Sequence, residues 1–221
     1  MSEGFFDIRN LGMTFRDRKG GLEVLRDISF TLGQEEFLCV LGPSGSGKST
    51  LLRLIAGLLK PTAGSINFRD CDCAPRVGLV FQHANLMPWR NVWQNIALPL
   101  ELQLVGADEI DARVDQMIRL VGLEEFSHSW PSELSGGMAQ RVAIARAFIQ
   151  EPDLLLLDEP FGALDALTRE RMGAELLTIW QDSRIPVIMV THSISEALLL
   201  SDRVLVFTHR PGQLAQDVPV T

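Results

Sequence analysis

The spacing of apolar residues divides the chain into a strand-rich first part, a helical middle and a last part in which strands and helices alternate. In the first part, apolar residues cluster in short runs between polar turns such as DRKGG, which is typical of strands. The expected strands cover residues 6–11, 24–32, 37–41, 65–68 and 77–81. One helix is expected over residues 50–59, where leucine and isoleucine recur at helical spacing, and Lys60 and Pro61 are expected to stop it.

The middle of the chain has mostly helical periodicity. Residues 107–121 carry charges on one side and apolar side chains on the other, and residues 132–149 form a second strongly helical segment. We therefore expect residues 87–148 to form a helical lobe inserted into an α/β core. That core would consist of residues 1–86 and 149–221 of a single domain.

In the last part, short apolar runs alternate with helical segments. Strands are expected at residues 154–157, 187–191 and 203–207, with helices at 167–182 and 193–200. This alternation predicts a mainly parallel sheet, so the expected fold class is α/β.

Composition and charge narrow the class of protein. The net charge of −8 comes from 20 Lys+Arg against 28 Asp+Glu, which disfavours binding to nucleic acid. No apolar run approaches the roughly 18–20 residues that a membrane-spanning helix needs. The start, MSEGFFDIRN, lacks the pattern of a secretory signal, so we expect a soluble, cytoplasmic protein.

The three cysteines do not predict a disulfide framework. Cys39 lies in an apolar run and is expected in the core. Cys71 and Cys73 are one residue apart, which is not a zinc-binding spacing, and a polar turn is the simpler interpretation.

A glycine-rich run, GPSGSGKST, follows the expected strand at 37–41 and opens the expected helix. It matches the phosphate-binding pattern G-x-x-x-x-G-K-[ST] in the structural context that pattern requires. Its glycines allow the backbone N–H groups to point at phosphate oxygens, while Lys48 can reach the β- and γ-phosphates and Ser49 can bind Mg²⁺. The candidate nucleotide-binding residues are Gly42, Pro43, Ser44, Gly45, Ser46, Gly47, Lys48, Ser49 and Thr50.

Two acidic residues follow the strand expected at 154–157. Asp158 would emerge at the carboxyl end of the sheet, where open α/β folds place their ligands, and could hold Mg²⁺. Glu159 could polarise a water molecule for attack on the γ-phosphate.

The run LSGGM at 134–138, placed between these two motifs, is the discriminating feature. Together with further single residues in the same order, it makes the whole chain resemble the nucleotide-binding subunits of ABC transporters. That resemblance implies ATP and Mg²⁺ as ligands and a head-to-tail homodimer. In such a dimer, Ser135, Gly136 and Gly137 would close over the ATP of the other subunit, and the helix from Gln140 onward would direct its positive end at the γ-phosphate.

The resemblance also assigns roles to residues that would be unremarkable alone. Gln82 matches a glutamine that senses the γ-phosphate and Mg²⁺, and His192 matches a histidine that contacts the γ-phosphate. Phe15 stands where the family has an aromatic residue that stacks on adenine. Residues 163–165 match a loop whose aspartate, Asp165, would reach across the dimer interface.

Within the family, FQHANLMPWRNVWQNIALPL at 81–100 resembles the nitrate, sulfonate and taurine importer branch. Leu86, Met87 and Trp89 would then line a groove for an integral-membrane permease. The resemblance implies a subunit on the cytoplasmic face of the cell membrane that powers small-solute import and works indirectly with a solute-binding protein.

Several alternatives are compatible with the same motifs. The chain could serve another ABC system, such as an importer of thiamin precursors or other solutes, or an exporter. A soluble ABC ATPase acting on DNA or ribosomes would be expected to show tandem cassettes, coiled coils or basic surfaces, and the chain shows none of them. A module that holds ATP without hydrolysis would not need Glu159, His192 and Ser135.

Overall fold

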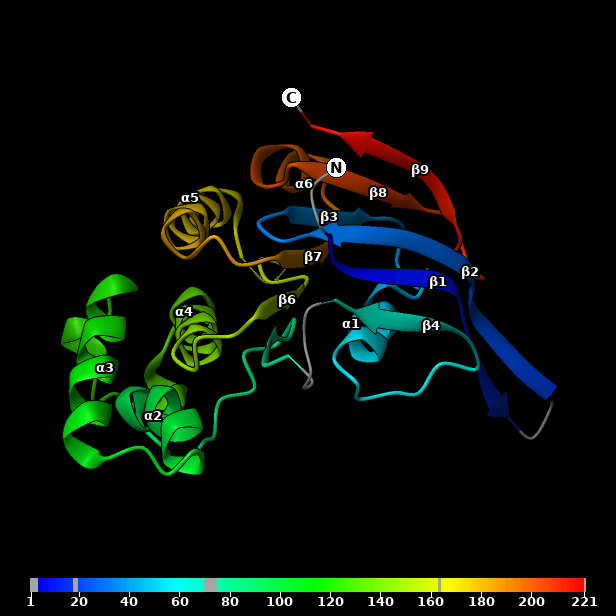
Figure 1. The fold of residues 1–221 in the computed structure, drawn as a ribbon. Coiled ribbons are helices and arrows are strands. Elements are labelled where there is room, and N and C mark those ends of the chain that lie inside the picture. The colour runs from blue at the N-terminus through cyan, green and yellow to red at the C-terminus, as the bar shows by residue number, and fades with distance from the viewer. Residues whose placement is uncertain (1–3, 18–19, 70–74, 163, 221) are drawn as a thin grey trace.

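The computed structural model describes residues 4–17, 20–69, 75–162 and 164–220, and it contains two sheets and six α-helices within those ranges (Figure 1). Cys71, Cys73 and Ala163 lie outside the described residues. The strands are β1 (Gly4–Asp17), β2 (Gly20–Gly33), β3 (Phe37–Leu41), β4 (Ala63–Phe68), β5 (Val77–Val80), β6 (Leu154–Asp158), β7 (Val187–Thr191), β8 (Arg203–Phe207) and β9 (Leu214–Pro219). The helices are α1 (Lys48–Ile55), α2 (Val92–Leu102), α3 (Ala107–Leu120), α4 (Gly136–Phe148), α5 (Ala166–Ser183) and α6 (Ile194–Leu200), with 3₁₀ turns at Glu124–Phe126 and Pro131–Glu133.

The larger sheet has the order β5-β6-β7-β3-β8-β9, and all of its neighbouring pairs are parallel except β8 with β9. The smaller sheet, in the order β2-β1-β4, is antiparallel. The predicted α/β class and the mainly parallel sheet are confirmed.

The larger sheet separates two hydrophobic layers, because β3, β6 and β7 are buried on both faces. One face packs against α1 and the smaller sheet, so that α1 lies between the two sheets. The other face packs against α4, α5 and α6, and α2 and α3 continue this layer away from the sheet (Figure 1). Cys39 is fully buried in this second layer, as expected, and burial raises the pKa of its thiol to about 12.

Two predicted helix boundaries are wrong. The helix expected over 50–59 is α1, which ends at Ile55, because Gly57 adopts φ +71° and the N–H of Leu58 donates back to the carbonyl of Arg53. Leu58 is consequently exposed. The helix expected from residue 132 begins only at Gly136, since Ser135 caps it.

One strand was not predicted. The side chains of β9 are mostly exposed, so its sequence has no apolar alternation. It pairs antiparallel with β8 at the edge of the larger sheet, and only this tertiary pairing makes it a strand.

None of the helices that the structure describes combines the length and the hydropathy required to cross a membrane.

Candidate active site

The candidate site lies at the carboxyl ends of the parallel strands. Pairing aligns Leu41 at the end of β3 with Thr191 at the end of β7, and Asp158 at the end of β6 with Val190. The predicted site residues that follow these strands therefore meet at one edge of the sheet.

The phosphate loop connects β3 to α1 in the predicted context. Gly45 and Gly47 adopt φ +79° and +95°, a region that side chains disfavour. A Cβ at Gly47 would lie 2.7 Å from Cδ2 of the fully buried Leu25, so the loop is tightly packed as well as left-handed at this position. Gly47 is followed directly by Lys48, the first residue of α1, so the loop runs into a helix N-terminus.

Lys48 is folded into the loop and is almost fully buried. Its Nζ donates to the carbonyls of Gly42 and Pro43 at 2.8 and 3.1 Å and lies 3.9 Å from Oε1 of Glu159. Burial lowers the pKa of Lys48, and the nearby carboxylates of Glu159 and Asp158 oppose that shift. The ammonium is thus held where a phosphate would enter.

Ser49 and Asp158 form a second polar pair beside the loop. The hydroxyl of Ser49 donates to Oδ1 of Asp158 at 2.8 Å. Burial raises the pKa of Asp158, partly offset by this hydrogen bond. The pair presents adjacent hydroxyl and carboxylate oxygens, which is the ligand chemistry that Mg²⁺ prefers.

Glu159 connects three strand ends. Its Oε2 lies 3.1 Å from Nδ1 of His192 and 3.5 Å from Nε2 of Gln82, which follow β7 and β5. Its backbone adopts φ +46°, which is uncommon for a residue with a side chain and is concentrated at functional sites. The structure thus brings together Gln82, Lys48, Glu159 and His192, which were predicted separately.

A cavity of about 340 Å³ lies beside the phosphate loop, Gln82 and Glu159. The residues that line it are Val24, Ser44, Gly45, Gly47, Lys48, Ser49, Thr50, Gln82, Glu159 and Arg210. Sequence reasoning missed Val24 and Arg210. Arg210 precedes a turn whose Gly212 exchanges backbone hydrogen bonds with Val24 (2.8 Å) and Arg26 (3.0 Å), and an arginine in such a Pro-Gly turn was its only local signal.

The residues of the LSGGM run do not line this cavity in the part of the chain that the structure describes. Ser135 caps α4 by accepting from the N–H of Met138, and the exposed Gly136 begins the helix. Gly136 and Gly137 belong to the first turn of α4, so they stand at the positive end of the helix, which the resemblance had placed at Gln140. Ser135 and Gly136 are exposed at this helix N-terminus.

Four other predicted positions have distinct surroundings. Phe15 lies on β1 opposite Leu22 and is 37% exposed. Asp165 caps α5 by accepting from the N–H and hydroxyl of Thr168, and the side-chain hydrogen bond is the main cause of its lowered pKa. Trp89 is 70% exposed, whereas Leu86 packs partly against the core.

Comparison with known proteins shows the family of the chain. The family profile described as ABC transporter matches residues 25–162. The nitrate import ATP-binding protein NrtD of Synechocystis sp. is 44% identical over 217 residues, covering 97% of this chain and 82% of the relative. The taurine import ATP-binding protein TauB of Pelagibacter ubique is also 44% identical, over 95% of this chain and 80% of the relative.

Solved structures show the same fold. The dimeric structure of MJ0796, a bacterial ABC transporter cassette, superimposes with a TM-score of 0.86 and 31% identity, covering 98% of this chain and 99% of that chain. The post-hydrolysis state of the same cassette, bound to ADP and Pi, gives a TM-score of 0.85 at 30% identity and covers 98% and 99% of the two chains. The chain therefore belongs to the ABC transporter family and has the fold of its ATP-binding cassettes.

Proposed function

We propose that the chain hydrolyses ATP to ADP and phosphate and thereby powers the import of a small solute. The observation that carries this proposal is the position of Glu159. This carboxylate lies within 3.1 Å of His192, 3.5 Å of Gln82 and 3.9 Å of Lys48, at the edge of a cavity lined by the phosphate loop. A candidate base (Glu159), two hydrogen-bonding groups (His192 and Gln82) and a cation (Lys48) thus lie together at one candidate active site.

The nucleotide would lie along the loop from Gly42 to Thr50. The loop's backbone N–H groups and the N-terminus of α1 would bind the β- and γ-phosphates. Lys48 would exchange its carbonyl acceptors for phosphate oxygens, which are stronger partners for an ammonium. Phe15, partly exposed on β1, would stack on the adenine.

Mg²⁺ would be held by Ser49 and Asp158, with Gln82 completing the site. The hydrogen bond between Ser49 and Asp158 brings two oxygen ligands together before any ion arrives. When bound, the ion would neutralise charge on the β- and γ-phosphates.

Glu159 would accept a proton from the attacking water, and His192 would hold its carboxylate in place. The left-handed backbone at Glu159 places its side chain between β5 and β7, so that both Gln82 and His192 reach the same oxygen. His192 would also contact the γ-phosphate.

A second copy of the chain would complete the site. Ser135, Gly136 and Gly137 are partly or fully exposed at the N-terminus of α4, and none of them lines the phosphate-loop cavity. In a head-to-tail homodimer this helix end would bind the γ-phosphate held by the other subunit. Asp165 would reach across the same interface.

The import role rests on the relatives, which are named as import ATP-binding proteins for nitrate and taurine. We propose that residues 87–148 act as a lobe distinct from the core of residues 1–86 and 149–221. Leu86, Met87 and the exposed Trp89 would receive an integral-membrane permease at the cytoplasmic face of the membrane. A solute-binding protein would act through that permease, and nucleic acid is not an expected partner.

Replacement of Glu159 by glutamine tests the hydrolytic role. The amide keeps the shape and one hydrogen-bonding oxygen but cannot accept the proton. We expect ATP binding to persist and steady-state turnover to fall by about 10²–10⁴-fold, the usual contribution of a general base. Glu125→Gln is the matched control, because Glu125 is exposed and does not line the nucleotide cavity, and it should leave turnover unchanged. Near wild-type turnover in Glu159→Gln would rule out this role for Glu159.

Mixed dimers test the action of the LSGGM run across the interface. A Ser135→Arg subunit and a Lys48→Ala subunit would each form homodimers with two inactive sites. A mixed dimer would keep one intact composite site and should recover ATPase activity. Absence of recovery in mixed dimers of confirmed assembly would contradict the head-to-tail arrangement.

A further inference from the structure

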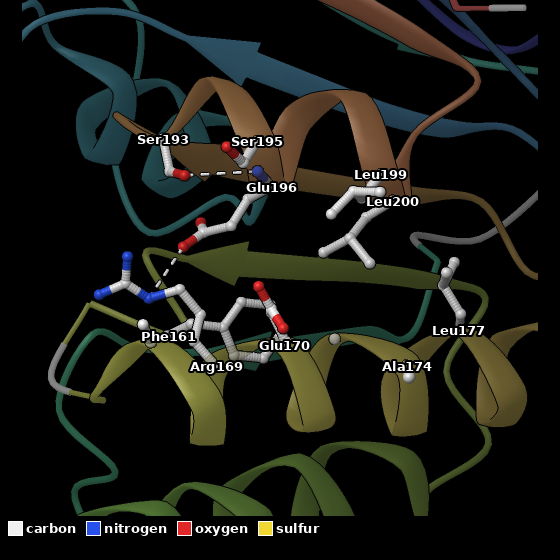
Figure 2. Close-up of a pocket in the computed structure, with 12 residues that line it drawn as sticks. Phe161, Arg169, Glu170, Ala174, Leu177, Ser193, Ser195, Glu196, Leu199 and Leu200 are labelled. Atoms are coloured by element: carbon white, nitrogen blue, oxygen red, sulfur yellow. Dashed lines mark hydrogen bonds and ion pairs between the residues drawn. The ribbon is translucent and has the colours of Figure 1, made fainter.

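A second cavity, of about 340 Å³, lies between α5 and α6 (Figure 2). One end of it is apolar, with Leu177, Leu199 and Leu200 (Figure 2). The other end is polar, where Arg169 of α5 points toward Glu196 of α6. The proposed mechanism uses none of these residues.

Glu196 is a buried carboxylate with a partner on each oxygen. Its side chain is 9% exposed. Oε2 accepts from the hydroxyl of Thr191 at 2.5 Å, and Oε1 lies 3.4 Å from Nε of Arg169. A carboxylate buried to this extent is strongly destabilising unless it is paired, so loss of either partner should displace it.

Through Thr191, Glu196 holds the backbone on both sides of His192. The hydroxyl of Thr191 donates to Glu196 and accepts from the N–H of Ser193 at 3.0 Å. The hydroxyl of Ser193 in turn accepts from the N–H of Glu196 at 3.3 Å (Figure 2). His192 lies between these two tied residues, and its ring contacts Glu159.

Arg169 extends the same chain of contacts to the segment before α5. Its Nη2 donates to the carbonyl of Leu164 at 2.9 Å, while its Nε faces Glu196. Leu164 directly precedes Asp165, the residue proposed to reach the other subunit. The guanidinium of Arg169 therefore joins two segments, residues 164–165 (the Asp165 segment) and residues 191–193 (the His192 segment).

Side-chain packing fills only part of the space between α5 and α6. Gly173 of α5 packs closely against Leu200 of α6, since a Cβ there would lie 3.3 Å from Cδ2 of Leu200, whereas the cavity remains open beside Arg169 and Glu196. At that end of the cavity, the polar contacts of Arg169 and Glu196 join the two helices.

We propose that Arg169 and Glu196 form a positioning pair that holds the His192 segment and the Asp165 segment in the relative position that ATP hydrolysis requires. The proposal rests on the proposed function, because it assumes that His192 and Asp165 act in hydrolysis. Neither residue of the pair lines the nucleotide cavity, so both act through other groups.

Single substitutions separate positioning from binding. Arg169→Gln and Glu196→Gln should each lower kcat for ATP hydrolysis about tenfold while the KM for ATP changes less than twofold, since displacement of a catalytic group affects the chemical step. Arg169→Lys should retain only part of the activity, because one ammonium cannot take the places of both Nη2, which donates to Leu164, and Nε, which faces Glu196.

A matched control is available at the start of β8, where another arginine pairs with a glutamate. Arg203 pairs with Glu36 at 2.7 Å, with side chains 22% and 16% exposed, and it lies outside the nucleotide cavity. Arg203→Gln should lower the Tm and leave kcat unchanged. If the Arg169 and Glu196 variants resemble this control, with a lower Tm and unaltered kcat, the pair is only structural and the proposal is wrong.

Epistasis with His192 provides the decisive comparison. If Glu196 acts through His192, Glu196→Gln should reduce kcat less than twofold in a His192→Ala background. A full tenfold reduction in that background would overturn the proposal. Wild-type protein without ATPase activity would instead refute the proposed function itself, so the two failures are distinguishable.

Discussion

Gly47→Ala is expected to destabilise the protein by about 2–5 kcal/mol, the sum of a backbone and a packing contribution. Gly47 has φ +95°, where a side chain costs about 1–2 kcal/mol. The new Cβ would also lie 2.7 Å from Cδ2 of Leu25 and 2.9 Å from Cγ1 of Val24. Because both neighbours are buried, the overlap should add about 1–3 kcal/mol.

Two other glycines separate these contributions. Gly45 has φ +79° but nothing within 4 Å of its Cβ position, so Gly45→Ala should cost only the backbone contribution of about 1–2 kcal/mol. Gly106 has φ −64° and an equally open Cβ position, so Gly106→Ala should leave stability unchanged or slightly raised.

Thermal unfolding measures the series. For a domain of this size, 1 kcal/mol shifts the Tm by about 2–4 °C, so Gly47→Ala should lower it by roughly 4–20 °C. The expected order of Tm is Gly106→Ala above Gly45→Ala above Gly47→Ala. Equal Tm values for the Gly45 and Gly47 variants would refute the packing contribution, and a Gly47 variant as stable as the Gly106 variant would refute both.

Two further predictions concern the cavity rim and the acid stability. Arg210→Ala should raise the KM for ATP about 3–10-fold with little change in kcat, because Arg210 lines the nucleotide cavity. The control His209→Ala, on the same exposed turn, should leave the KM unchanged. An unchanged KM in the Arg210 variant would exclude a contact between Arg210 and the nucleotide. Asp153 has a lowered pKa because Arg76 donates hydrogen bonds to it. The contribution of Asp153 to the free energy of unfolding is therefore present above its ordinary pKa of 3.8 and is lost as the pH falls through its lower pKa in the folded protein. Asp153→Asn should therefore reduce the free energy of unfolding at neutral pH and flatten its decline in acid, as measured by urea unfolding against pH; parallel curves for the two proteins would contradict this.

Some features were predictable because local sequence carries their physical cause. β3, β7 and β8 match their predicted bounds, since short runs that are wholly or largely apolar have few other ways to be buried. The phosphate loop was predictable for a similar reason. Its glycines and Lys48 must stand in one continuous segment to surround a phosphate.

Other features depended on partners far away in the chain. β9 is a strand only because β8 offers an edge. Arg210 was missed because its proximity to the phosphate loop comes from a turn tied to β2.

The sequence by itself therefore determined the family, the fold class and most of the candidate site residues, because motif spacing and apolar runs are local properties. Only the tertiary structure decided that Glu159, His192 and Gln82 share one carboxylate oxygen, because parallel strand pairing aligns three separate chain segments at one edge. The tertiary structure likewise decided that Arg169 and Glu196 meet beside the cavity between α5 and α6. An ion pair between two helices depends on how the helices pack and not on the spacing of its residues in the chain.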